Sequence, residues 1–346
     1  MSVGPADLPA GRPTGRPAEL AADLPPDLPT GRPGSVRTVF LGSGPFGIEA
    51  LRRLAGHPRI ALVGVVTAPP RPVGRRAVVS PTPVDTTARE LDVPVLTPPR
   101  LRAPDGVAEV LALDPALAVL ADYGQLVPPA ILGLAHGALN LHPSLLPRHR
   151  GASPIAATIL AGDRETGVTL LRMDEGLDSG PIVAVERVAL TGTETAPELE
   201  ARLAVVAAEL LARSIGPWLA GALAPRPQPA QGVTLSRSLR REDGRLDPMR
   251  AAGELERQVR AYQPWPGSWF ETGAGRIVVW RAEAVEEQPG AQAATPGMIA
   301  KHGLVTADGL LGLREVQPAG GRRMGWDELV RGRPSIVGSS VVPVRQ

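Results

Sequence analysis

The sequence contains no cysteine, a single lysine and few aromatic residues. Without cysteine the chain has no disulfide, no thiolate metal ligand and no cysteine nucleophile, which suits a cytoplasmic enzyme. Because Lys301 is the only lysine, arginine supplies nearly all the cations, and arginine binds phosphate through a planar fork that stays charged. Apolar runs as long as the roughly 18 residues of a membrane helix are also missing, so we expect no membrane contact.

What the sequence does contain is enough apolar material for two cores. Its 346 residues are 43% hydrophobic, which is ordinary for a globular protein. The formal net charge is only +2. A nucleic-acid partner would therefore need a local basic patch, because the protein as a whole is not strongly basic.

The chain changes composition several times along its length. Residues 1–35 repeat Asp-Leu-Pro and Gly-Arg-Pro, which predicts a disordered tail ahead of a fold that starts near Val36. Alternating strand and helix patterns over 36–222 predict a first domain of the α/β class, with a Rossmann-like, mostly parallel sheet. Three prolines indicate a linker over 223–232. Short strands bounded by Gly or Pro over 233–346 predict a small, OB-like β-barrel domain.

Asn140 and His142 lie two residues apart in a predicted strand over 138–142, directly before Pro143. Side chains at this spacing point to the same face of a strand, and proline ends the strand pairing. The two side chains should therefore lie together beyond the end of the sheet. An amide can donate a hydrogen bond to a carbonyl oxygen and an imidazole can move a proton, which is the minimum for acyl transfer.

Asp178 lies in a glycine-flanked turn, Glu175–Gly180, between strands predicted over 167–173 and 182–189. A carboxylate beside an imidazole raises the imidazole pKa and orients the ring. We expect Asp178 to meet Asn140 and His142 at the carboxyl end of the sheet, where open α/β folds bind ligands. The sequence shows no spacing typical of metal ligands, so we expect no metal.

A Gly-x-Gly-x-x-Gly sequence, Gly42–Gly47, follows the first predicted strand. This pattern is typical of dinucleotide binding. The second predicted strand, however, ends without the acidic residue that would hold a ribose, and Pro45 removes a backbone donor from the turn. We favour a tight turn beside the site. An NADP-dependent oxidoreductase, with Arg71 on the 2′-phosphate, stays open as an alternative.

Four motifs follow one another in the order Asn140–Pro147, Arg150-Gly151, Gly167–Thr169 and Met173–Gly180. Together they resemble the folate-dependent formyltransferase family, and the similarity runs from about Val36 to about Gly338. The helix that contains 256–262 and the turn Pro264–Gly267 are similar to the members that act on aminoacylated initiator tRNA.

The resemblance implies a donor, 10-formyltetrahydrofolate, and an acceptor, the α-amine of methionyl-initiator tRNA. The matching catalytic residues would be Asn140, His142 and Asp178. The folate-contacting residues would be Ser144, Leu145, Leu146 and Pro147. The residues for the acceptor would be Phe46, Arg71, Arg75, Arg76 and Tyr123. The domain over 36–222 would be catalytic, and the barrel over 233–346 would bind the tRNA.

The chemistry implied for this site is stabilisation of negative charge. An α-amine with a pKa of about 8 is already nucleophilic at neutral pH. The difficulty is the charge that develops on the formyl oxygen, which Asn140 and a His142 imidazolium would stabilise. We expect Asp178 to keep His142 charged and to help pass a proton to the leaving nitrogen.

Departures from the family pattern leave acceptor selectivity open. Gly44-Pro45 and Asp122 replace residues that are common near the expected acceptor pocket. A formyltransferase acting on an amino-sugar nucleotide or another small amine is an alternative. It would need neither the basic loop over 69–79, which contains Arg71, Arg75 and Arg76, nor the helix with Arg257 and Arg260. A hydrolase of formyl-folate and a non-catalytic tRNA- or folate-binding protein are further alternatives. We expect a monomer.

Overall fold

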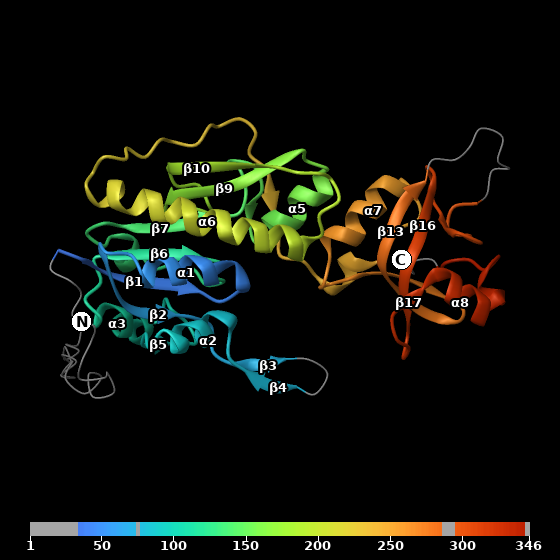
Figure 1. Ribbon diagram of the computed structural model, residues 1–346, viewed down its shortest axis with the longest axis horizontal. Helices are drawn as coiled ribbons and strands as arrows, with labels where there is room; N and C mark the ends of the chain where they lie inside the picture. Colours follow the sequence, from blue (N-terminus) through green and yellow to red (C-terminus); the bar gives the residue numbers. More distant parts are fainter. Residues whose placement is uncertain (1–33, 74–76, 286–294, 343–346) are drawn as a thin grey trace, which may run out of the picture.

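The computed structural model describes residues 34–73, 77–285 and 295–342 (Figure 1). A seven-stranded sheet with its helices forms one part, and a smaller, β-rich part lies beside it. The tail predicted over 1–35 lies almost entirely outside the described residues. Arg75 and Arg76, two of the predicted tRNA-binding residues, also lie outside them.

The first sheet is mostly parallel, as predicted. Its order is β10-β9-β7-β6-β1-β2-β5, and these strands follow one another from top to bottom in Figure 1. Strands β5, β2, β1, β6 and β7 run parallel, whereas β9 is antiparallel to β7 and β10 to β9. The bounds are β1 (Val36–Gly42), β2 (Ile60–Val66), β5 (Val95–Leu96), β6 (Leu117–Ala121), β7 (Ala138–His142), β9 (Glu165–Arg172) and β10 (Ile182–Ala189).

Helices cover both faces of this sheet because its central strands are hydrophobic on both sides. Phe40 packs into the cluster under α1, α2, α5 and α6, while its neighbours Val39 and Leu41 pack into the cluster under α3 and α4. The bounds are α1 (Ile48–Ala55), α2 (Pro83–Glu90), α3 (Pro104–Leu111), α4 (Pro129–Leu132), α5 (Pro154–Ala161) and α6 (Ala196–Leu219). A short 3₁₀ helix, η1 (Pro45–Gly47), precedes α1.

A small hairpin follows β2 where the sequence predicted only a loop. It consists of β3 (Arg71–Val73) and β4 (Val78–Ser80), and Arg71 is exposed on it. The hairpin projects away from the sheet in Figure 1. Strands β1 and β6 separate β2, from which it emerges, from β7.

The second part of the chain is an antiparallel sheet with its own hydrophobic core. Its strands are β12 (Ser268–Thr272), β13 (Gly275–Val285), β14 (Ile299–Ala300), β15 (Gly303–Val305), β16 (Leu310–Pro318) and β17 (Met324–Gly325). Helices α7 (Ala252–Ala261) and α8 (Trp326–Gly332) pack on it, with the 3₁₀ helices η2 (Arg241–Gly244) and η3 (Pro334–Ile336) beside them. The sequence did not predict β12 or α8. Of the strand predicted over 341–344, the two described residues are not in a strand.

Helix α7 joins the two parts. Ala261 and Tyr262 at its end belong to the core under the first sheet. Arg257 Nε donates to the Leu160 carbonyl (3.1 Å), and Arg260 donates to the Glu194 carbonyl (2.9 Å) while pairing with Glu256 (2.6 Å). The sequence analysis counted these two arginines against a small-amine acceptor, and in the structure their side chains dock the helix onto the first part.

None of the helices in the described ranges is long and apolar enough to cross a membrane.

Candidate active site

The structure brings Asn140, His142 and Asp178 together, as the sequence predicted. Asn140 Nδ2 donates to Asp178 Oδ1 (3.3 Å), and His142 Nδ1 lies 3.6 Å from Asp178 Oδ2. Leu139 and Leu141 point into the core, so the alternation of β7 turns Asn140 and His142 to the opposite face. Their catalytic roles remain predictions that this geometry supports.

The turn that carries Asp178 has a shape that only a few residue types tolerate. Asp178 itself has a left-handed backbone (φ 48°). A Cβ on Gly180 would lie 1.9 Å from the Arg172 carbonyl oxygen, so glycine is required there. The backbone N–H of Gly151 donates to Asp178 Oδ2 (2.8 Å). The carboxylate is therefore held by two donors and has one oxygen facing the imidazole.

His142 is buried, with 4% of its surface exposed. Its Nε2 lies 2.9 Å from the carbonyl oxygen of His149, and a carbonyl only accepts, so Nε2 carries a hydrogen. Burial lowers the pKa of His142 below its ordinary value of 6.5, although the Asp178 carboxylate acts to raise it. Burial thus acts against the expected effect of Asp178 on the charge of His142.

A neutral His142 with its hydrogen on Nε2 leaves a lone pair on Nδ1, the nitrogen that faces Asp178. That lone pair can take a proton, and the resulting imidazolium would gain the attraction of the carboxylate 3.6 Å away. The ring is thus arranged as a proton acceptor.

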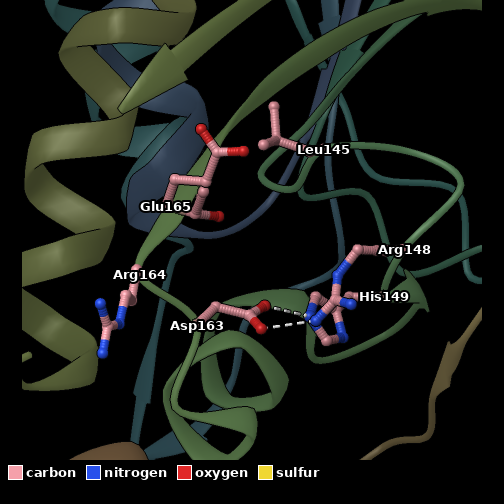
Figure 2. Close-up of a pocket in the computed structure, with 7 residues that line it drawn as sticks. Leu145, Arg148, His149, Asp163, Arg164 and Glu165 are labelled. Atoms are coloured by element: carbon pink, nitrogen blue, oxygen red, sulfur yellow. Dashed lines mark hydrogen bonds and ion pairs between the residues drawn. The ribbon is translucent and has the colours of Figure 1, made fainter. Parts of the chain in front are cut away.

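A second ion cluster lies behind His142 and holds the carbonyl that it uses. His149 Nε2 lies 2.8 Å from Asp163 Oδ2, and Arg148 donates to the other oxygen (2.5 Å) (Figure 2). The backbone N–H of His149 donates to Thr234 Oγ1 (2.8 Å). Arg148, His149 and Asp163 border a cavity of about 250 Å³, together with Leu145 of the predicted folate loop. No local pattern in the sequence pointed to this cluster.

The predicted folate loop is held rigidly, and half of its side chains are used internally. Ser144 is fully buried and its hydroxyl donates to the Arg148 carbonyl (2.6 Å). Leu146 packs with Leu171 and Ile182. Leu145 and Pro147 are half-buried. Of the four predicted contacts, Leu145 and Pro147 therefore keep accessible side chains, while Ser144 and Leu146 shape the loop.

The predicted acceptor residues are not gathered in one place. Phe46 is 2% exposed and packs in the core under α1 and α6, so the structure gives it a packing role instead of a place in the site. Tyr123 follows β6 at the same sheet edge as His142. Its hydroxyl is buried without a hydrogen-bond partner among the residues that the structure describes. Arg71 lies on the separate hairpin, exposed to solvent.

The glycine-rich turn after β1 is shaped by Asp122. A Cβ on Gly44 would lie 1.6 Å from Asp122 Oδ2, so the second glycine makes room for a carboxylate. Burial raises the pKa of Asp122, and burial together with the Asp122 charge raises the pKa of Glu200 on α6. Two acidic side chains, Asp122 and Glu200, would disfavour binding of a negatively charged pyrophosphate at this turn. This argues against the dinucleotide alternative. Across the described residues, no group of His, Asp and Glu side chains is arranged to hold a metal ion.

An acid–amide–imidazole cluster at the carboxyl edge of a mostly parallel sheet is the arrangement expected of a group-transfer enzyme. Residues 36–215 match the formyl transferase family, and residues 238–334 match the formyl transferase C-terminal domain. The chain therefore belongs to the formyl transferase family.

Two curated relatives match nearly the whole chain. The methionyl-tRNA formyltransferase of Symbiobacterium thermophilum is 41% identical over 315 residues, which cover 89% of this chain and 96% of that protein. The methionyl-tRNA formyltransferase of Gluconacetobacter diazotrophicus is 44% identical over 310 residues, covering 88% and 99%.

Solved structures share the fold at low identity. HypX from Aquifex aeolicus, in complex with tetrahydrofolic acid, has a TM-score of 0.55 and 18% identity, covering 85% of this chain and 47% of that chain. The N-formyltransferase from Helicobacter canadensis, in complex with folinic acid and dTDP-3-aminofucose, has a TM-score of 0.57 and 15% identity, covering 80% and 99%.

Proposed function

We propose that the protein transfers the formyl group of 10-formyltetrahydrofolate to the α-amine of methionyl-initiator tRNA, which gives N-formylmethionyl-tRNA. The observation that carries this proposal is the convergence of Asn140, His142 and Asp178 at the end of β7. It occurs in a chain that is 41–44% identical, over most of its length, to curated methionyl-tRNA formyltransferases.

Each of the three side chains has a separate role in the proposed reaction. Asn140 has a second amide hydrogen besides the one on Asp178, and it donates to the formyl oxygen as negative charge develops there. His142 Nδ1 takes the proton that the amine nitrogen loses as its bond to the formyl carbon forms. Asp178 stabilises the imidazolium until a proton reaches N10, whose bond to the formyl carbon breaks. Formylated amine and tetrahydrofolate then leave.

The remaining assignments follow from the family. We assign catalysis to residues 36–222 and tRNA binding to 233–346, connected through 223–232, with Leu145 and Pro147 as accessible folate contacts. Arg71 on the hairpin supplies phosphate contacts, as do Arg75 and Arg76, which follow it in the sequence. Tyr123, with its buried hydroxyl, lies on the acceptor side. We place the enzyme in the cytoplasm, as a monomer.

Acceptor identity is tested by competition. Methionyl-initiator tRNA and an amino-sugar nucleotide are mixed with the protein and 10-formyltetrahydrofolate, and mass spectrometry identifies the formylated product. We expect formylmethionyl-tRNA, at a rate that falls steeply with salt because arginine–phosphate contacts release counterions. A formylated sugar with unmodified tRNA would favour the rival acceptor. Free formate with neither product would favour the hydrolase.

Replacing Asp178 with Asn tests the effect of the Asp178 charge separately from the effect of its side-chain shape. Asp178→Asn keeps the size of the side chain but removes the charge opposite His142 Nδ1, so the pKa of His142 should fall still further below 6.5. We expect kcat to fall by about 100-fold, because the imidazolium loses its partner and the turn loses its alignment. Imidazole NMR titrations and single-turnover kinetics measure the two effects. A His142 pKa that stays the same or rises would contradict this interpretation.

A further inference from the structure

Several residues of the segment between α6 and α7 form hydrogen bonds with residues around the active site. It runs beside β10 at the outer edge of the first sheet (Figure 1). Arg226 and Ile182 exchange backbone hydrogen bonds of 2.7 and 2.8 Å. Ile182 lies just after the turn that carries Asp178. The segment predicted as a linker therefore extends the sheet next to that turn.

Gln228 occupies the centre of this segment. Its Nε2 donates to the carbonyl of Asp178 (2.7 Å) and to the carbonyl of Gly180 (2.8 Å), so both amide hydrogens are used. Its Oε1 accepts two hydrogen bonds from the Arg150 guanidinium, at 3.0 and 2.7 Å. Pro227 and Pro229 flank it and favour an extended backbone at this position.

The same segment holds the opposite wall of the site. Downstream of Gln228, β11 (Leu235–Ser236) pairs in parallel with β8 (Arg150–Gly151). Arg150 N–H donates to the Thr234 carbonyl (2.9 Å), and the Ser236 hydroxyl donates to the Arg150 carbonyl (3.1 Å). Gly151, which donates to Asp178 Oδ2, thus has its position fixed by the segment too.

We propose that Gln228 is a positioning residue for formyl transfer, which clamps the Asp178 turn against Arg150 and so sets the distance between Asp178 and His142. This inference rests on the proposed function, because it assigns a role within that reaction. It also means that the segment connecting the two parts of the chain contributes a residue that positions the active site.

The clamp acts on His142 through Asp178. The titratable groups whose charges act on His142 are Asp178, which raises its pKa, and His149, which lowers it. If the clamp is released, the carboxylate moves away from Nδ1 and the pKa of His142 should fall. A residue that merely supports the fold would not move this titration.

The test compares three variants of the full-length protein. Gln228→Ala removes the clamp. Gln228→Glu keeps the side-chain size and the partner for Arg150, but it turns oxygens toward the two carbonyls. Gln231→Ala alters an exposed glutamine of the same segment and serves as the matched control. Each variant is measured by single-turnover formyl transfer, by KM for both substrates and by NMR titration of His142.

We expect kcat to fall by about 10- to 100-fold in both Gln228 variants, with KM values little changed and with His142 titrating at lower pH. Gln231→Ala should match the unmodified protein. Rates in Gln228→Glu equal to the control would overturn the clamp, as would a loss of kcat with an unshifted His142 titration. If the unmodified protein itself transfers no formyl group, the proposed function fails instead, and the titration alone still decides whether Gln228 positions Asp178.

Discussion

The His142→Ala variant is expected to lose about 100- to 10,000-fold in kcat, with binding of 10-formyltetrahydrofolate nearly intact. The variant removes the group that accepts the amine proton, and positioned acid–base groups contribute factors of this size. Folate affinity should survive because the ring bonds to the His149 carbonyl, while the proposed folate contacts Leu145 and Pro147 stay unchanged. Single-turnover kinetics at saturating substrates measures the first effect, and equilibrium binding of the folate measures the second.

His142→Gln provides the control for packing. Glutamine fills most of the buried space and can still donate to the His149 carbonyl, but it cannot take a proton at neutral pH. Both variants should therefore be slow, even if His142→Ala is also less stable. Fast turnover by His142→Gln would mean that a group other than His142 accepts the proton of the amine.

The Asn140→Ala variant is expected to lose about 100- to 1,000-fold in kcat, equivalent to roughly 3–4 kcal/mol of transition-state stabilisation. Asn140 is only half-buried in β7 and its side chain lies outside the hydrophobic core, so truncation should leave the fold intact. The loss should appear in kcat more than in KM, because the formyl oxygen gains negative charge only as the amine attacks. Asn140→Ala also frees Asp178 Oδ1, so the His142 titration is measured in parallel.

A rise in KM with unchanged kcat would show that Asn140 binds substrate without stabilising the oxyanion. The melting temperature of the variant is the control for folding.

Local patterns predicted the strands that build the site. The strands β6, β7 and β10 begin and end at the predicted residues, because hydrophobic runs bounded by Gly or Pro identify buried strands. The same patterns missed β12 and α8. These elements are short, and tertiary packing stabilises them through side chains such as Phe270 and Trp326, which are 0% and 2% exposed.

The candidate site was predicted in part for the same reason. The spacing of Asn140 and His142 placed them on one face, and the glycines around Asp178 indicated a close approach. The charge state of His142 depends on burial, which is a property of the folded protein that no local pattern reveals. Gln228 meets Asp178 across 50 residues of sequence, so only the fold could bring it to notice.

Glycine motifs show how far such patterns can mislead. Gly44 matched the second glycine of a dinucleotide signature, where glycine allows a phosphate to approach. In the structure the space beside Gly44 is taken by the Asp122 carboxylate. The sequence analysis favoured a tight turn over a dinucleotide site, and in the structure the group that requires glycine here belongs to the protein itself.

The most direct test follows the formyl group itself. The unmodified protein and an Asn140→Ala/His142→Ala double variant are each given 10-formyltetrahydrofolate with a ¹³C-labelled formyl group and methionyl-initiator tRNA. The label on the α-amine is then measured during a single turnover. We predict rapid transfer by the unmodified protein, with transfer by the double variant slower by at least the loss seen in either single variant. An unlabelled α-amine in the first reaction, or equal rates in the two, would contradict the assignment of formyl transfer to this site.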